Sequence, residues 1–171
     1  YVSVNEVYQF TWNYFASHYI EITKSRAYNF TGKYSQLEQR GAWYVLHYTL
    51  RKILQMLAPI MPFVTDAIYR ELYGKSVHAE SFPEPEEEYL EESPDLALRV
   101  QEVNHAIWKY KKEQGIKLSE PLEKKLYLPI QVKPVIEELV DLHGLRQVEF
   151  YGDKPPENAI EIESGVFIES I

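Results

Sequence analysis

The sequence predicts a mainly α-helical fold, in which an antiparallel helical bundle precedes a small β-α-β-β subdomain. Apolar residues recur at spacings of three and four over the first 72 residues and again over residues 94–114. Prolines and glycines mark the ends of these segments. Beyond residue 123 the apolar runs become short, which is typical of strands. We therefore expect two domains, residues 1–115 and residues 116–171.

The first helix is predicted over residues 3–28. Its main apolar stripe consists of Val4, Tyr8, Trp12, Phe15, Tyr19 and Ile22. Val7, Phe10 and Tyr14 form a second apolar face. Because both sides of such a helix need cover, we expect it to lie inside the bundle.

A second helix is predicted over residues 35–57. Ser35 and Glu38 form a capping box, since each side chain can accept a backbone N–H of the first turn. Pro59 ends this helix. The apolar stripe consists of Trp43, Leu46, Leu50, Ile53 and Leu57.

A third, shorter helix should start at Pro62, because the first helical position needs no N–H donor. Val64, Ile68 and Leu72 are expected to form its buried face, and Gly74 to close it.

Residues 75–93 interrupt the helical pattern with prolines among acidic residues. We interpret this segment as a solvated strap of the first domain, because it lacks the spaced oxygen ligands of a calcium loop. A fourth helix is predicted over residues 94–114, and Gly115 should end it. Its buried side is expected to be Leu96, Val100, Val103, Ile107 and Tyr110.

The remaining chain is predicted to be mixed. Residues 124–130 and 147–151 are expected to be strands, with a helix at 135–142 between them. Residues 160–163 and 166–169 should form a hairpin that turns at Ser164 and Gly165.

The net charge of −8 alone argues against a nucleic-acid ligand, but the charge is unevenly distributed. Residues 1–72 carry +2 and residues 98–126 carry +3, whereas residues 73–97 and 127–171 carry −7 and −6. A basic face is therefore possible on an acidic chain. The absence of cysteine excludes disulfides and favours a cytoplasmic location. No apolar run is long enough to cross a membrane, so we expect no membrane partner.

The sequence contains no catalytic or metal-binding signature. Its seven glycines are too scattered to form a phosphate-binding loop, and no zinc motif occurs. We therefore predict no catalytic residue, no metal ligand and no cofactor in this chain. Residue types alone indicate a helical interaction domain.

Several stretches together suggest a family. Phe10-Thr11-Trp12 followed by His18-Tyr19-Ile20-Glu21 resembles the long helix of the valyl-tRNA synthetase anticodon-binding domain. The run Leu57-Ala58-Pro59-Ile60-Met61-Pro62-Phe63 resembles the break between helices that class I synthetases for valine, isoleucine and leucine share. Ile107-Trp108-Lys109-Tyr110-Lys111-Lys112-Glu113 is similar to the last helix of archaeal-type valyl enzymes. The resemblance covers roughly residues 4–122.

This resemblance implies a C-terminal piece of a class Ia ligase that attaches valine to tRNA(Val) with ATP and Mg. The HIGH and KMSKS signatures of the catalytic domain lie upstream in that family and do not occur here. The chain alone is thus expected to be non-catalytic. The family has helical sequence before position 1, so we expect an uncovered apolar strip on the first helix, or self-association through it.

The resemblance also implies that the bundle holds the tRNA anticodon stem-loop while the catalytic domain of the same chain acts on the far end. Phosphate neutralisation by Lys and Arg and stacking of unpaired bases on rings would provide the contact. Arg51 and Lys52 are weaker candidates. The predicted RNA-binding residues are Lys24, Arg26, Arg40, Trp108, Lys109, Tyr110, Lys111 and Lys112.

Three other interpretations remain open. The basic residues can be ordinary solvated faces. The chain can also be the same domain of an isoleucyl-tRNA synthetase. Finally, it can be a bundle that binds a protein helix in an apolar groove instead of RNA.

Overall fold

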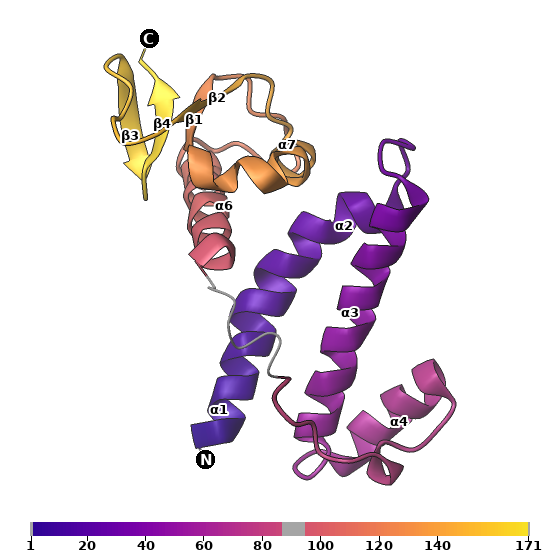
Figure 1. Cartoon of the computed structure of the whole chain (residues 1–171). Coiled ribbons are helices and arrows are strands. Elements are labelled where there is room, and N and C mark those ends of the chain that lie inside the picture. Colours follow the sequence, from indigo (N-terminus) through magenta and orange to yellow (C-terminus); the bar gives the residue numbers. More distant parts are fainter. Residues whose placement is uncertain (1, 87–94, 171) are drawn as a thin grey trace. The chain divides into compact units, whose positions relative to one another are not determined.

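The computed structural model describes residues 2–86 and 95–170, and it divides the chain into two compact units (Figure 1). Unit 1 comprises residues 1–92 and unit 2 residues 93–171. The predicted mainly α fold with a small C-terminal sheet is confirmed. The expected boundary after residue 115 differs from the one observed, because the fourth helix packs on the sheet that follows it.

The first helix of unit 1 is continuous but changes its hydrogen-bonding pattern twice. It consists of α1 (Val2–Gln9), the π-helix η1 (Phe10–Tyr19) and α2 (Ile20–Tyr28). The Ile20 N–H donates to the Phe15 carbonyl, five residues back. Each such bond adds a residue to the turn, so side chains no longer repeat at the α-helical period.

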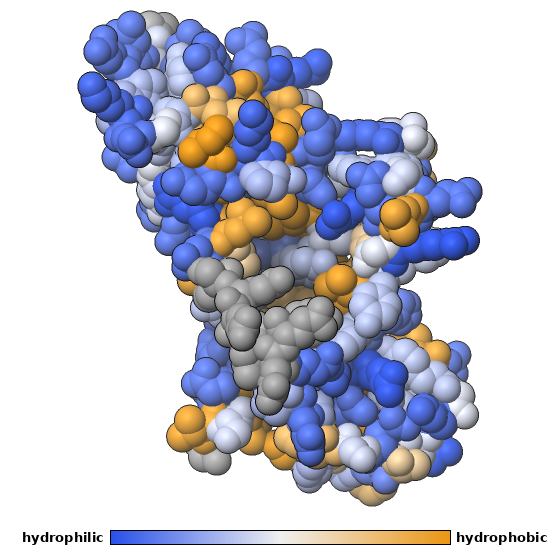
Figure 2. Space-filling view, in the orientation of Figure 1, coloured by the Kyte–Doolittle hydropathy of each residue, from blue (hydrophilic) through white to orange (hydrophobic). Residues whose placement is uncertain are grey.

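The π-helix changes which side chains are buried. Phe15 is buried, whereas Trp12, from the same predicted stripe, is 62% exposed. Phe10 and Tyr14 of the second predicted face are also exposed. The expectation that both faces are covered is wrong for α1 and the first half of η1. The expected uncovered strip is instead present there, and hydrophobic side chains reach the surface where α1 begins (Figure 2).

The helix α3 (Gln36–Leu57) lies alongside the first helix, and α4 (Pro62–Tyr73) packs at the far end of α3 (Figure 1). The predicted capping box is formed, with Ser35 Oγ accepting from the Glu38 N–H and the Glu38 carboxylate accepting from the Ser35 N–H. Pro62 begins α4, and Gly74 ends it in the left-handed conformation, as predicted.

The buried face of α4 differs from the predicted one. Val64, Ile68 and Leu72 are all exposed, whereas Thr65 and Tyr69 are buried. The stripe is rotated by one residue because Tyr69 fits against α3, where it packs with three other side chains. These are Leu54, Ala58 and Val77.

The segment after α4 is fixed by Asp66. Its carboxylate accepts hydrogen bonds from the Ser76 hydroxyl, from the Val77 N–H and from Arg70. The Arg70 and Ser76 hydrogen bonds lower the pKa of Asp66 to about 2. A short helical turn, η2 (Val77–Ala79), follows, and residues 80–86 have no regular secondary structure, in agreement with the predicted strap. The rest of that strap lies outside the described residues.

Unit 2 begins with α6 (Asp95–Glu113), which Gly115 ends as predicted. The strands are β1 (Leu126–Pro129), β2 (Val148–Tyr151), β3 (Ala159–Glu163) and β4 (Val166–Glu169). They form a sheet in the order β2-β1-β4-β3, in which only β1 and β2 are parallel. The turn η3 (Ile130–Val135) and the helix α7 (Ile136–His143) connect that parallel pair. The predicted order of strands and helix is confirmed.

The core of unit 2 lies between α6, α7 and the sheet. Val103, Ile107, Leu126 and Leu139 are fully buried there. Leu96, expected on the buried side of α6, is exposed at its first turn. None of the helices in the described ranges 2–86 and 95–170 is both long and apolar enough to cross a membrane.

Candidate nucleic-acid interface

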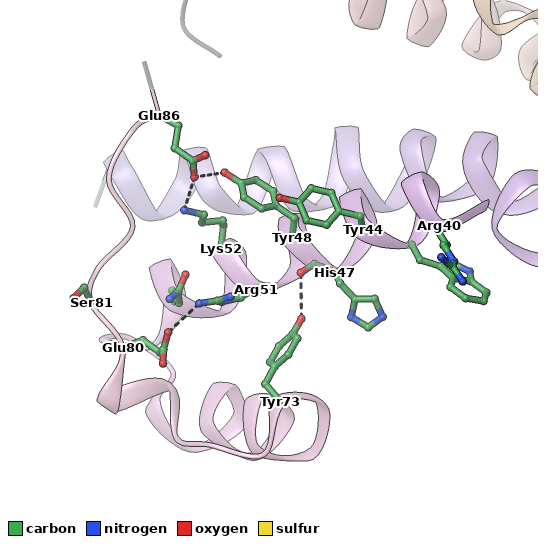
Figure 3. Close-up of a pocket in the computed structure, with 12 residues that line it drawn as sticks. Arg40, Tyr44, His47, Tyr48, Arg51, Lys52, Tyr73, Glu80, Ser81 and Glu86 are labelled. Atoms are coloured by element: carbon green, nitrogen blue, oxygen red, sulfur yellow. Dashed lines mark hydrogen bonds and ion pairs between the residues drawn. The ribbon is translucent and has the colours of Figure 1, made fainter. Parts of the chain in front are cut away.

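An open groove of about 800 Å³ runs along α3 in unit 1 (Figure 3). Three cationic side chains line it, Arg40, Arg51 and Lys52. Arg40 lies near the start of α3, and the other two lie in its second half. Because Arg51 is 11 positions from Arg40, which is close to three helical turns, α3 presents these two on one side, and Lys52 reaches the groove from the next position of the helix.

Aromatic rings lie between these cations. Tyr44 and Tyr48 stack with ring centres 5.9 Å apart, and Tyr44 is 65% exposed. The His47 and Tyr73 rings meet edge to face, and the Tyr73 hydroxyl donates to the His47 carbonyl at 3.1 Å. Trp43 also lines the groove, and its indole N–H donates to the Ala27 carbonyl at the end of α2. The groove thus combines positive charge with accessible rings, as single-stranded nucleic-acid sites do.

The Arg51 guanidinium is held in a fixed position. Its Nε–H donates to the hydroxyl oxygen of the buried Tyr69 at 3.0 Å, and Nη2 pairs with Glu80 at 3.1 Å. The hydrogen bond to Tyr69 raises the pKa of Arg51. A charged donor anchored in this way is already oriented for an anion.

Lys52 is also oriented by its neighbours. Its ammonium pairs with the Glu86 carboxylate at 2.9 Å and lies 5.2 Å from the centre of the Tyr48 ring. The hydrogen bond to Glu86 raises the pKa of Lys52. Arg51 and Lys52 were the weaker candidates in the sequence, and the structure places both in the groove.

The other predicted RNA-binding residues of unit 1 have different positions. Arg40 is exposed and lines the groove. Lys24, in the middle of α2, pairs with Glu21 at 2.7 Å. Arg26 lies in the last turn of α2 and is half-buried. Only Arg40 among the three lines the groove.

Lys111 is the clearest departure from the sequence prediction. Its side chain is fully buried, and its ammonium donates to the carbonyls of Leu118, Glu120 and His143 at 3.1, 2.6 and 2.8 Å. Burial lowers the pKa of Lys111. The prediction that Lys111 contacts RNA is therefore corrected, because all three donors of the ammonium point to protein carbonyls in this fold.

The remaining members of the basic-aromatic cluster on α6 differ in their exposure and contacts. Lys109 pairs with Glu163 of β3 at 3.1 Å, and Lys112 is exposed. Trp108 and Tyr110 are half-buried. Their density along the sequence reflects neighbouring positions on a helix, which point in different directions.

A second exposed aromatic pair, missed in the sequence, lies at the connection between α2 and α3. Tyr28 and Phe30 stack with ring centres 5.2 Å apart, and Phe30 is 88% exposed. The connection is held by Asn29, whose side chain accepts from the Tyr34 N–H and donates to the Tyr34 carbonyl. The lack of periodicity in this segment concealed the pair.

The groove and its rings can be compared with known proteins. Residues 1–126 match the model of the anticodon-binding domain of tRNA ligases. The chain belongs to this family. The match extends from unit 1 through α6 into the start of the sheet.

Two relatives with similar sequences are valine–tRNA ligases of archaea. The chain is 41% identical over 168 residues to the valine–tRNA ligase of Aeropyrum pernix, covering 96% of this chain and 20% of the relative. It is 41% identical over 148 residues to that of Pyrobaculum aerophilum, covering 86% of this chain and 18% of the relative. The chain thus spans at most a fifth of the length of these relatives. The resemblance to archaeal-type valyl-tRNA synthetases is confirmed.

No group of three or more metal-ligating side chains is assembled within the described residues. The chemistry that the groove supports is binding, by charge and by ring stacking. It provides donors for phosphate oxygens and flat faces for bases.

Proposed function

We propose that this anticodon-binding chain holds the anticodon stem-loop of tRNA(Val), and that the groove along α3 is its RNA contact surface. The observation that carries the proposal is that the rings of Tyr44 and Tyr48 line the groove between Arg40 at one end and Arg51 with Lys52 at the other. Cations there would neutralise phosphates of the loop, and the exposed Tyr44 ring would stack on an unpaired base.

The complete protein is proposed to be a cytoplasmic valine–tRNA ligase. Its catalytic domain, in the same polypeptide, would bind ATP and Mg and would attach valine to the far end of the tRNA. This chain contributes position rather than chemistry, because holding the anticodon loop fixes where the acceptor end lies. The support is the family match over residues 1–126 and the valine–tRNA ligases that the chain resembles.

Substitutions in the groove should affect RNA binding more than substitutions on α6, the other candidate surface. Arg40→Glu should weaken binding of the valine tRNA about tenfold and reduce the salt dependence of binding by about one phosphate contact. Tyr44→Ala should weaken binding by a similar factor, through lost stacking. Fluorescence anisotropy of a labelled tRNA transcript, titrated over a series of salt concentrations, measures both.

Lys112→Glu is the matched control, since it makes the same charge change on an exposed position of α6. We expect it to change the affinity less than Arg40→Glu does. The reverse result would move the RNA surface to α6.

Two further outcomes test the alternative functions. Equal affinities for valine and isoleucine tRNAs would oppose the valine assignment. No tRNA binding by the wild type would favour a protein-binding bundle.

Self-association of the isolated chain remains a prediction. It is supported by the exposed rings of Tyr8, Phe10 and Trp12 on the first helix. Light scattering should detect dimers at high concentration, and Trp12→Ser should reduce them because less apolar surface remains to be buried. A single monomeric species over the whole concentration range would contradict this.

A further inference from the structure

Two of the three cations that line the groove, Arg51 and Lys52, already have anionic partners from the same chain. Glu86 lies at one end of the irregular segment 80–86, and its carboxylate accepts hydrogen bonds from Lys52 Nζ and from the Tyr48 hydroxyl (Figure 3). One carboxylate oxygen, Oε1, accepts both bonds. An ammonium and a phenol therefore converge on a single anionic oxygen.

Glu80, at the other end of that segment, also accepts hydrogen bonds from two donors, Arg51 and Lys75. Its Oε2 lies 3.1 Å from Arg51 Nη2, and its Oε1 lies 2.6 Å from Lys75 Nζ. The hydrogen bond from Arg51 to Tyr69 holds the guanidinium in place, independently of Glu80. Removal of the carboxylate would thus leave an oriented, charged donor in the groove.

A phosphate group makes the same contacts as these carboxylates. Both present negatively charged oxygens that accept hydrogen bonds from ammonium, guanidinium and phenol donors. The groove between these donors and the exposed Tyr44 is open and has a volume of about 800 Å³. The positions of the two carboxylates therefore indicate where a polyanion with stacking bases would place its phosphates.

We propose that Lys52 with Tyr48, and Arg51, form two phosphate subsites, which Glu86 and Glu80 occupy until RNA displaces them. This assignment rests on the proposed function, because RNA is the ligand that supplies the phosphates. The carboxylates act as competitors within the same chain. They lower the affinity of the groove for any polyanion.

The exchange is feasible because both ion pairs are partly open to solvent. Side-chain exposure is 28% for Lys52 and 42% for Glu86. Exposed ion pairs contribute little net stability, so a phosphate can replace a carboxylate without disrupting the fold. Residues 80–86 form no helix or strand, and Glu80 and Glu86 contact α3 through their side chains. Breaking these ion pairs therefore disrupts no regular secondary structure.

The test compares two glutamate variants of one segment. Glu86→Gln should increase the affinity for a valine tRNA transcript about two- to fivefold, because Lys52 loses its competitor. Glu84→Gln is the matched control: it makes the same charge change on an exposed side chain that does not line the groove. It should change the affinity much less.

The salt dependence gives a second readout. In the wild type, a phosphate that takes Lys52 leaves Glu86 free to bind a cation from solution, which offsets one released counterion. Without Glu86 this offset disappears, so the slope of log affinity against log salt should become steeper, by at most the value of about 0.7 to 0.9 for one phosphate contact. Glu84→Gln should leave the slope unchanged.

A double variant locates the effect. In a Lys52→Gln background, Glu86→Gln should no longer increase affinity beyond Glu84→Gln. Equal affinities and slopes for the two single variants, with normal tRNA binding by the wild type, would overturn the phosphate subsites but not the proposed function. If the wild type binds no tRNA, both are overturned. Circular dichroism of each variant confirms that the fold is retained.

Discussion

Lys111→Met should destabilise unit 2 by about 2–4 kcal/mol, because the carbonyls that its ammonium satisfies lose a charged hydrogen-bond donor. Methionine preserves most of the length and apolar stem of lysine, so the packing around this position of α6 changes little. What is lost is the ammonium that satisfies the carbonyls of Leu118, Glu120 and His143. These carbonyls come from the loop after α6 and from the end of α7, so one side chain connects three segments.

Lys112→Met is the control, because it makes the same substitution one residue further, at an exposed position. Its effect should stay within about 0.5 kcal/mol. Urea denaturation followed by hydrogen exchange and mass spectrometry assigns the loss to peptides of residues 95–170. Equal stabilities of the two variants would show that the three hydrogen bonds to Lys111 contribute little.

Lys111 also illustrates what the sequence could not predict. Lys109, Lys111 and Lys112 are identical side chains within one helical turn, and only the second is buried. Its burial depends on acceptors from residues 118–143, and local patterns carry no information about them. A cluster of lysines on a helix is therefore weak evidence for a basic surface.

Local features were predictable because they depend on neighbouring residues only. The capping box at Ser35 and Glu38, Pro62 at the start of α4 and the left-handed Gly74 all formed as expected. The buried face of α4 was not, because Val64 and Tyr69 are both apolar enough to be buried. Which of the two is buried depends on the shape of the α3 surface that α4 packs against, and this shape cannot be inferred from the sequence of α4 alone.

The groove includes some residues that the sequence predicted and some contacts that it could not predict. Arg40 was predicted, and Arg51 with Lys52 was suggested, from charge and family resemblance. The rings of Tyr44 and Tyr48 were missed because the apolar stripe of that helix was assigned to the core. Their spacing of four residues, and the seven residues from Tyr44 to Arg51, places them on one face and could have revealed the site. The contacts to Glu80 and Glu86 could not be predicted, since they depend on how an irregular segment returns to α3.

His143 should make the stability of unit 2 depend on pH below neutrality. The ring is buried against α6, where its Nε2 lies 2.8 Å from the Asn104 side-chain oxygen and Trp108 meets it edge to face. With that oxygen as acceptor, Nε2 carries the hydrogen, and the buried Nδ1 has no hydrogen-bond partner among the described residues, which favours the neutral ring. Burial, together with the nearby Lys111 ammonium, lowers the pKa of His143 from 6.5 to about 3.

The sign follows from where the proton binds. Below pH 6.5 the unfolded chain takes up a proton at position 143 and the folded chain does not, until the pH approaches 3. The contribution of His143 to stability is therefore complete above pH 6.5 and is lost as the pH falls. The slope is at most about 1.4 kcal/mol per pH unit, which gives about 2 kcal/mol between pH 6.5 and 4.5.

An exposed histidine on α6, the helix against which the His143 ring packs, separates this effect from the general titration of carboxylates. His143→Gln should lower stability at pH 7 but flatten its dependence on pH between 6.5 and 4.5 by about one proton. His105→Gln, an exposed substitution on α6, should leave that dependence unchanged. Urea denaturation at a series of pH values, read by hydrogen exchange in unit 2, measures both slopes. If they change equally, the ring of His143 takes up its proton at the same pH in the folded and unfolded chains, and burial does not lower its pKa.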